Sequence, residues 1–108
     1  MQTTVQVVCT QGPSLRNRLM QDSATLEEFG LTVVRGKMAG KNPGWSKLHS
    51  NRSEHGAINV RWDSPTRTLL CHVVTKGSGK PHAIIGAFVD YLLARFRGRI
   101  RTINVFPR

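Results

Sequence analysis

The clearest pattern in the chain is the alternation of apolar and polar residues in several short segments. Val5, Val7 and Cys9 alternate with more polar neighbours, so residues 3–9 are predicted to form a strand. The apolar run at 31–34 predicts a second, shorter strand. Residues 58–62 and 67–75 flank a turn at 63–66, which predicts a β-hairpin.

Two other segments carry a helical spacing. Residues 15–29 fit it loosely and predict either one irregular helix or a short pair, with Ser23 as the cap of the second helix and Gly30 at its end. The best helix begins near Pro81 and ends at Gly98. It carries a continuous apolar stripe formed by Ile85, Phe88, Val89, Leu92 and Phe96. A closing strand is predicted at 99–106, with Ile103 and Val105 facing inward.

The order of these elements predicts the fold class. Strand, helix, strand, hairpin, helix and strand favour an α+β two-layer sandwich. We expect a mostly antiparallel sheet of about five strands, with the long C-terminal helix packed on one face, in a single domain spanning 1–108. Residues 35–56 are rich in glycine and poor in apolar residues, so they predict a basic loop with at most a partial strand at 47–50.

Charge is distributed unevenly along the chain. Residues 1–34 hold two basic and three acidic side chains, a net charge of −1, whereas residues 35–108 hold fourteen basic and three acidic side chains, a net charge of +11. Their sum is the formal charge of +10, and the sequence pI is near 11.2. Such a concentrated positive field indicates a polyanionic partner, with nucleic acid first and an acidic protein as the alternative.

The densest basic cluster lies where the C-terminal helix is followed by the closing strand. It consists of Arg95, Arg97, Arg99 and Arg101. One or two cations at a helix C-terminus are explained by the helix dipole, but four alternating arginines exceed what capping requires. Because the guanidinium group can donate two hydrogen bonds to one phosphate, we expect this cluster to bind anions.

The glycine-rich loop is the second basic feature. Its candidate phosphate ligands are Arg35, Lys37, Lys41, Lys47 and Arg52. Trp45 lies among them, and an exposed tryptophan can stack on an unpaired base, although most tryptophans pack into a core. The segments 36–41 and 77–80 contain Gly and Lys but lack the complete P-loop spacing, which argues against a nucleotide triphosphatase.

Catalytic and metal-binding residues give a weaker pattern. His49, Glu54 and His55 lie together in the loop region and could supply acid and base for phosphodiester cleavage, as in a small ribonuclease. No spacing of cysteines and histidines matches a zinc site, and we expect neither a metal nor a cofactor. An enzyme is therefore the less favoured class.

Cellular context and assembly follow from the remaining features. Two cysteines in strand-like runs, with no signal peptide or membrane-length apolar run, favour a cytoplasmic protein with no membrane partner. The strand at 67–75 offers apolar residues of both parities, including Leu70 and Val74, whereas a sheet face exposed to water should be polar. Either the loop or a second subunit should cover that face, which favours a homodimer.

Several segments in the last two-thirds of the chain resemble small bacterial proteins. They are the run 44–50, the strand segment 59–62, the helix segment 88–93 and the end at 99–108. In these, and in its size, the chain is similar to the products of mobile integron gene cassettes. This resemblance implies a bacterial origin and, because cassette products include toxins, keeps the ribonuclease alternative open.

Taken together, these features predict a small basic protein that contacts the phosphates of DNA or RNA without catalysis. Two alternatives remain: a ribonuclease or toxin-like enzyme, and a homodimeric interaction module that binds an acidic protein.

Overall fold

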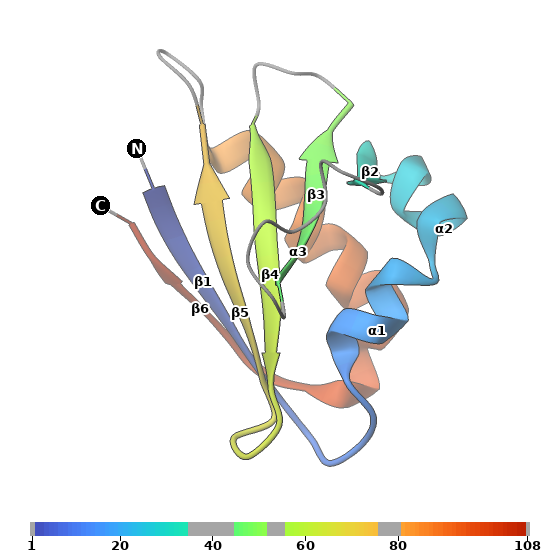
Figure 1. Cartoon of the computed structure of the whole chain (residues 1–108), viewed down its shortest axis with the longest axis vertical. Helices are drawn as coiled ribbons and strands as arrows, with labels where there is room; N and C mark the ends of the chain where they lie inside the picture. The colour runs from blue at the N-terminus through green and yellow to red at the C-terminus, as the bar shows by residue number, and fades with distance from the viewer. Residues whose placement is uncertain (1, 35–44, 52–55, 76–80, 108) are drawn as a thin grey trace.

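The strand nearest the N-terminus does not lie at an edge of the sheet. The computed structural model describes residues 2–34, 45–51, 56–75 and 81–107, and in these β1 (Gln2–Cys9) pairs with β5 (Thr68–Val74) on one side and with β6 (Ile100–Phe106) on the other. The sheet has six strands in the order β2-β3-β4-β5-β1-β6. Its other strands are β2 (Leu31–Val34), β3 (Trp45–Ser50) and β4 (Ala57–Asp63). Every pairing is antiparallel, and the predicted α+β fold is confirmed (Figure 1).

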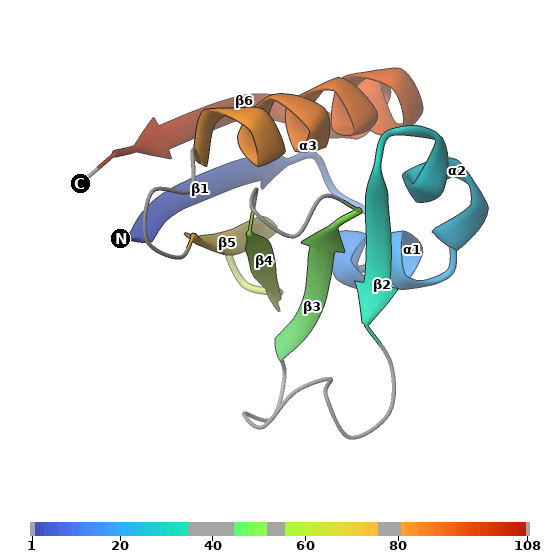
Figure 2. The same ribbon diagram turned by 90° about the horizontal axis from the view of Figure 1, so that it is seen from above.

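The helices lie on one side of this sheet. They are α1 (Leu15–Met20), α2 (Ser23–Glu28) and α3 (Pro81–Phe96), and a 3-10 turn at Arg97–Arg99 connects α3 to β6. Viewed from above, the sheet curves around them, and α3 runs alongside β1 and β6 (Figure 2). None of the helices in the described ranges is long and apolar enough to cross a membrane.

The hydrophobic core lies between the helices and one face of the sheet. Alternate strand residues point into it, as the pleat requires, among them Val5, Val7, Ile58, Val60 and Leu69, which are fully buried. Cys9 and Cys71 also lie in this core as free thiols. Burial raises the pKa of both thiols, so they stay protonated and behave as small apolar side chains.

The segment at 15–29 forms the short pair of helices that was one of the two expectations. Ser14 caps α1, because its Oγ accepts a hydrogen bond from the Asn17 N–H at 3.3 Å. Asp22, rather than the predicted Ser23, occupies the cap position of α2. Gly30 follows the helix with a φ of +79°, a conformation that glycine adopts without steric cost.

The C-terminal helix is present where predicted, but the stripe that it buries is rotated. Ile84 and Tyr91 are fully buried, whereas Ile85 and Val89, which the sequence placed in the stripe, are only partly buried. Tyr91 is not among the residues of the predicted stripe. Its ring instead makes edge contacts with Phe29 and Phe96, with centroids 5.8 Å and 5.9 Å away. The helix therefore contacts Phe29, the residue that follows α2, as well as the sheet.

The basic loop predicted at 35–56 is interrupted by β3, which gives six strands instead of about five. The strand was underestimated because only one residue of its inward parity is large and apolar, namely Leu48 between Ser46 and Ser50. Leu48 is fully buried and pairs with Val33 on one side and Ile58 on the other. Pairing with two neighbours, rather than its own sequence pattern, therefore places this segment in the sheet.

Candidate functional site

The side of the sheet opposite the helices carries two rows of side chains that cross the strands. Residues paired directly in an antiparallel sheet point to the same side. The first row consists of Lys47, Asn59, His72, Thr4 and Phe106. The second consists of Trp45, Arg61, Leu70, Gln6 and Asn104. We call these ten residues the outer face; β3, β4, β5, β1 and β6 all contribute to it, and the viewer of Figure 1 faces this side of the sheet.

An aromatic pair, Trp45 and His72, lies on the part of the outer face that β3, β4 and β5 form. The Trp45 indole of β3 reaches across β4 to the His72 imidazole of β5, with ring centroids 4.9 Å apart and the planes tilted by 39°. Both side chains are half-buried, so part of each ring meets solvent. Trp45 therefore lies outside the hydrophobic core, and part of its surface is exposed.

Two cations flank this pair. The Arg61 guanidinium lies 6.0 Å from the centroid of the Trp45 ring, within the range of a cation–π contact. Lys47 stands beside Trp45 on the same strand and the same side. In the part of the chain that the structure describes, the outer face contains no carboxylate.

The acidic residues lie elsewhere. Asp22, Glu27, Glu28 and Asp90 belong to the helical layer. Asp63 lies at the end of β4, where its carboxylate accepts hydrogen bonds from the Thr66 N–H and hydroxyl in the hairpin turn. Asp63 has the same parity as Arg61 and pairs with Thr68, so it lies on the same side of the sheet, one row beyond the ten residues of the outer face. The acids of the helical layer lie on the other side.

The far end of the outer face is uncharged and combines polar side chains with one aromatic ring. Asn104 Nδ2 donates a 3.2 Å hydrogen bond to Gln6 Oε1 across the β6–β1 pair, and Thr4 lies in the neighbouring row. Phe106, at the end of that row, is 52% exposed. Amide groups can donate and accept hydrogen bonds, so this end can recognise polar edges beside an aromatic surface.

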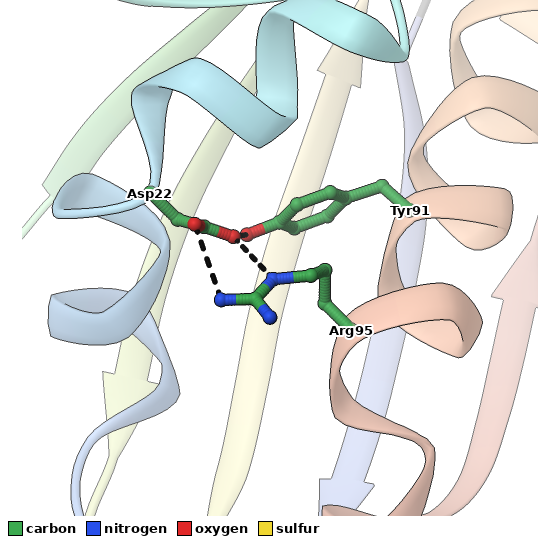
Figure 3. Close-up of polar contacts among 3 residues, drawn as sticks. All are labelled: Asp22, Tyr91 and Arg95. Carbon is green, nitrogen blue, oxygen red and sulfur yellow. Dashed lines mark hydrogen bonds and ion pairs between the residues drawn. The ribbon is translucent and has the colours of Figure 1, made fainter.

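Two members of the predicted arginine cluster, Arg95 and Arg99, donate hydrogen bonds to acceptors within the protein. Arg95 Nε donates to Asp22 Oδ2 at 2.9 Å, and Tyr91 donates to the same oxygen at 2.7 Å (Figure 3). Burial by itself raises the pKa of Asp22, but the hydrogen bonds from Arg95 and Tyr91 outweigh it and hold this pKa below its ordinary value. Arg95 therefore joins α3 to the α1–α2 connection.

Arg99 is also engaged within the protein. Its Nη2 donates to the carbonyl oxygens of Pro13, at 2.9 Å, and Thr10, at 3.4 Å. The sequence placed Arg99 and Arg101 on one strand face, but Arg99 lies in the 3-10 turn and β6 starts after it. An irregularity in the β1–β6 register next to Arg101 breaks the expected alternation. Arg97 and Arg101 are exposed, and so is Arg95, whose side chain is 45% exposed beside Asp22.

Several candidate residues lie outside the described ranges. They are Arg35, Lys37, Lys41, Arg52, Glu54 and His55. Of the alternative catalytic set only His49 is described; it is exposed, and its Nδ1 lies 2.9 Å from the Ser50 carbonyl oxygen. Among the residues that the structure places, no three His, Cys, Asp or Glu side chains gather as metal ligands would.

Sequence reasoning named Trp45 and Lys47 but missed the residues that the sheet brings to them. Arg61, His72, Asn59, Gln6 and Asn104 were not candidates. The available signal was parity: each occupies an outward position of a strand whose inward positions are apolar. The alignment of these positions into rows depends on the register between strands that are distant in sequence, which no local pattern contains.

No protein-family model, curated protein or solved structure matches this chain. The resemblance to integron-cassette products and the bacterial origin that it implies therefore stay predictions.

Proposed function

We propose that the protein binds nucleic acid without catalysis, and that the outer face is its principal contact surface. The observation that carries this proposal is the grouping of Lys47 and Arg61 with Trp45 on the helix-free side, whereas the acids described in the helices lie on the other. A polyanion that meets the sheet avoids those acids. The excess of +10 over the whole chain supplies the long-range attraction.

The exposed arginines extend this surface in the proposal. Arg97 and Arg101 remain candidates for phosphate contacts, whereas Arg95 and Arg99 are assigned to the structure because protein acceptors engage them. The basic residues at 35–41 and Arg52 also remain candidates. Phosphate contacts of this kind position a protein on nucleic acid with little sequence preference.

A titration by fluorescence anisotropy tests the proposal. Labelled DNA and RNA, each single- and double-stranded, are titrated with the protein at several salt concentrations. We expect affinity to fall linearly on a logarithmic plot against salt, with the slope decreasing by about 0.7–0.9 for each phosphate contact that a substitution removes. Arg61→Gln should lower this slope, and Arg18→Gln, an exposed arginine of α1, should leave it unchanged.

Three results would contradict the proposal. Absence of binding at low salt would exclude nucleic acid as the partner and favour an acidic protein. Shortening of the RNA during the titration, abolished by His49→Ala, would favour the ribonuclease alternative. An equal loss of slope in Arg18→Gln and Arg61→Gln would show that the outer face holds no special place in binding.

A further inference from the structure

The aromatic side chains of the outer face indicate which kind of nucleic acid, single-stranded or double-stranded, this surface is suited to bind. Cations alone attract single and double strands alike, because both carry phosphates. Trp45 and His72 offer ring surfaces instead, with centroids 4.9 Å apart, on the same side of the sheet as Arg61. In a duplex the faces of the bases are stacked on one another, so an aromatic platform reaches them only in a single strand.

The outer face also has a second aromatic group at a suitable place. Phe106 ends the row that starts at Lys47 and passes through His72, and half of its surface is exposed. From β3 to β6 the sheet has four strand-to-strand intervals, about 19 Å at the usual spacing. A chain crossing the strands would therefore meet one aromatic group near each end of the row.

Between these groups lie side chains suited to the edges of unpaired bases. Asn59 and Thr4 are in the same row as His72, and Gln6 and Asn104 are beside them. Gln6 and Asn104 satisfy each other through a 3.2 Å hydrogen bond, and both groups retain further donors and acceptors. Base edges in single strands are accessible to such groups, whereas in duplexes the pairing edges are occupied.

We infer that the outer face binds single-stranded nucleic acid across the strands, with bases stacked on the Trp45–His72 pair and on Phe106 and with phosphates next to Lys47 and Arg61. This inference rests on the proposed function and specifies its ligand. DNA and RNA share the chemistry concerned, so both are arms of the test.

The two tryptophans allow a direct test. Trp62 points to the opposite side of the sheet from Trp45 and packs against the core, so Trp62→Phe leaves Trp45 as the sole tryptophan emitter. This variant is titrated with oligo-dT and oligo-U of about ten nucleotides, a length within the range of small single-strand binding folds. The matching blunt duplexes form the comparison. We expect saturable quenching of Trp45 fluorescence by the single strands, with at least about tenfold tighter binding than for the duplexes.

Substitutions then locate the stacking sites. Trp45→Ala should weaken single-strand binding about 5- to 150-fold, the usual effect of removing one stacked base, and should leave duplex binding unchanged. Phe106→Ala should have a smaller effect in the same direction. Leu93→Ala is the matched control, because Leu93 is similarly exposed, at 40%, but lies on α3. Circular dichroism confirms that each variant is folded.

Two outcomes separate the inference from the proposed function. If duplexes bind as tightly as single strands and Trp45 fluorescence does not change, the single-strand inference is wrong while nucleic-acid binding stands. If neither form binds at low salt, the proposed function itself fails. The quenching measurement does not alter the outer face, so it decides the question even if Trp45→Ala does not fold.

Discussion

Tyr91 and Asp22, 69 residues apart in sequence, are joined by a 2.7 Å hydrogen bond from the phenol to carboxylate Oδ2. The phenol is buried, and Asp22 also accepts hydrogen bonds from Arg95. We predict that Tyr91→Phe lowers the free energy of unfolding by about 1.5–3 kcal/mol, because it removes a hydrogen bond to a charged carboxylate without creating a cavity. Urea titration followed by circular dichroism measures the change; stability equal to that of the parent would contradict it.

The same carboxylate should make stability depend on pH. The pKa of Asp22 is lower in the folded protein than its ordinary value of 3.8, so its contribution is fully present above that pH and is lost as the pH falls through the folded pKa. We predict that Asp22→Asn is less stable than the parent at neutral pH and that the difference shrinks below about pH 3.8. Glu27→Gln, an exposed acid of α2, is the control; a difference independent of pH would contradict the assignment.

Two glycines with positive φ should respond differently to alanine. A Cβ at Gly56, where φ is +92°, would lie 2.2 Å from the Val74 carbonyl oxygen, whereas a Cβ at Gly30, where φ is +79°, has nothing within 4 Å among the described atoms. Gly30→Ala should cost only the conformational penalty of about 1–2 kcal/mol. Gly56→Ala should cost clearly more, because backbone must also move. The midpoints of thermal unfolding of the two variants are compared. Equal midpoints would contradict the prediction and show that the backbone near Gly56 moves at little cost in free energy.

We predict that the arginines after α3 have two different roles, one in stabilising the fold and one in binding nucleic acid. Arg99→Ala should lower stability by about 1.5–3 kcal/mol, since its guanidinium donates to two backbone carbonyls. Arg97→Ala with Arg101→Ala should leave stability unchanged and reduce the salt dependence of nucleic-acid binding by up to about 1.4–1.8 in slope. Melting curves and salt-dependent anisotropy on both variants check this division. Loss of stability in the double variant would place these arginines with the structural ones.

The predicted homodimer has a defined consequence if it forms through the outer face. Val74 lies on the same side of the sheet, next to His72 on β5, and is 39% exposed, so a second copy could cover it together with Leu70. We then expect self-association and nucleic-acid binding to exclude each other. Multi-angle light scattering should show the protein component changing from two chains of 12.0 kDa to one when oligo-dT is added. A complex that retains two chains would place the dimer interface elsewhere.

Local sequence patterns were sufficient to predict most of the elements of the fold. The hairpin of β4 and β5, the closing strand and the two helical regions follow from alternation, turn residues and helical spacing, all of which lie within short windows. β3 was reduced to a partial strand because its inward positions are mostly serine. Tyr91 was not predicted in the buried stripe because its burial depends on Asp22 and Phe29, which flank α2 and are far away in the sequence.

The candidate site was less accessible to sequence reasoning. Charge density drew attention to the run from Arg95 to Arg101, but two of its four members are engaged by protein acceptors. The density of arginines along the sequence does not show which guanidinium groups will form hydrogen bonds within the folded protein. The contact between Trp45 and His72 spans an intervening strand, so it arises only from the complete register of three strands.

The central position of β1 has a consequence for how the chain is made. Val7 of this strand pairs with Leu69 and Ile103, both from the opposite half of the chain. During synthesis, β1 leaves the ribosome long before either neighbour exists, and contacts between such distant segments form slowly. We expect β1, which precedes the other five strands of this sheet in the chain, to be among the last to find its partners, with its apolar side exposed until β5 and β6 have emerged.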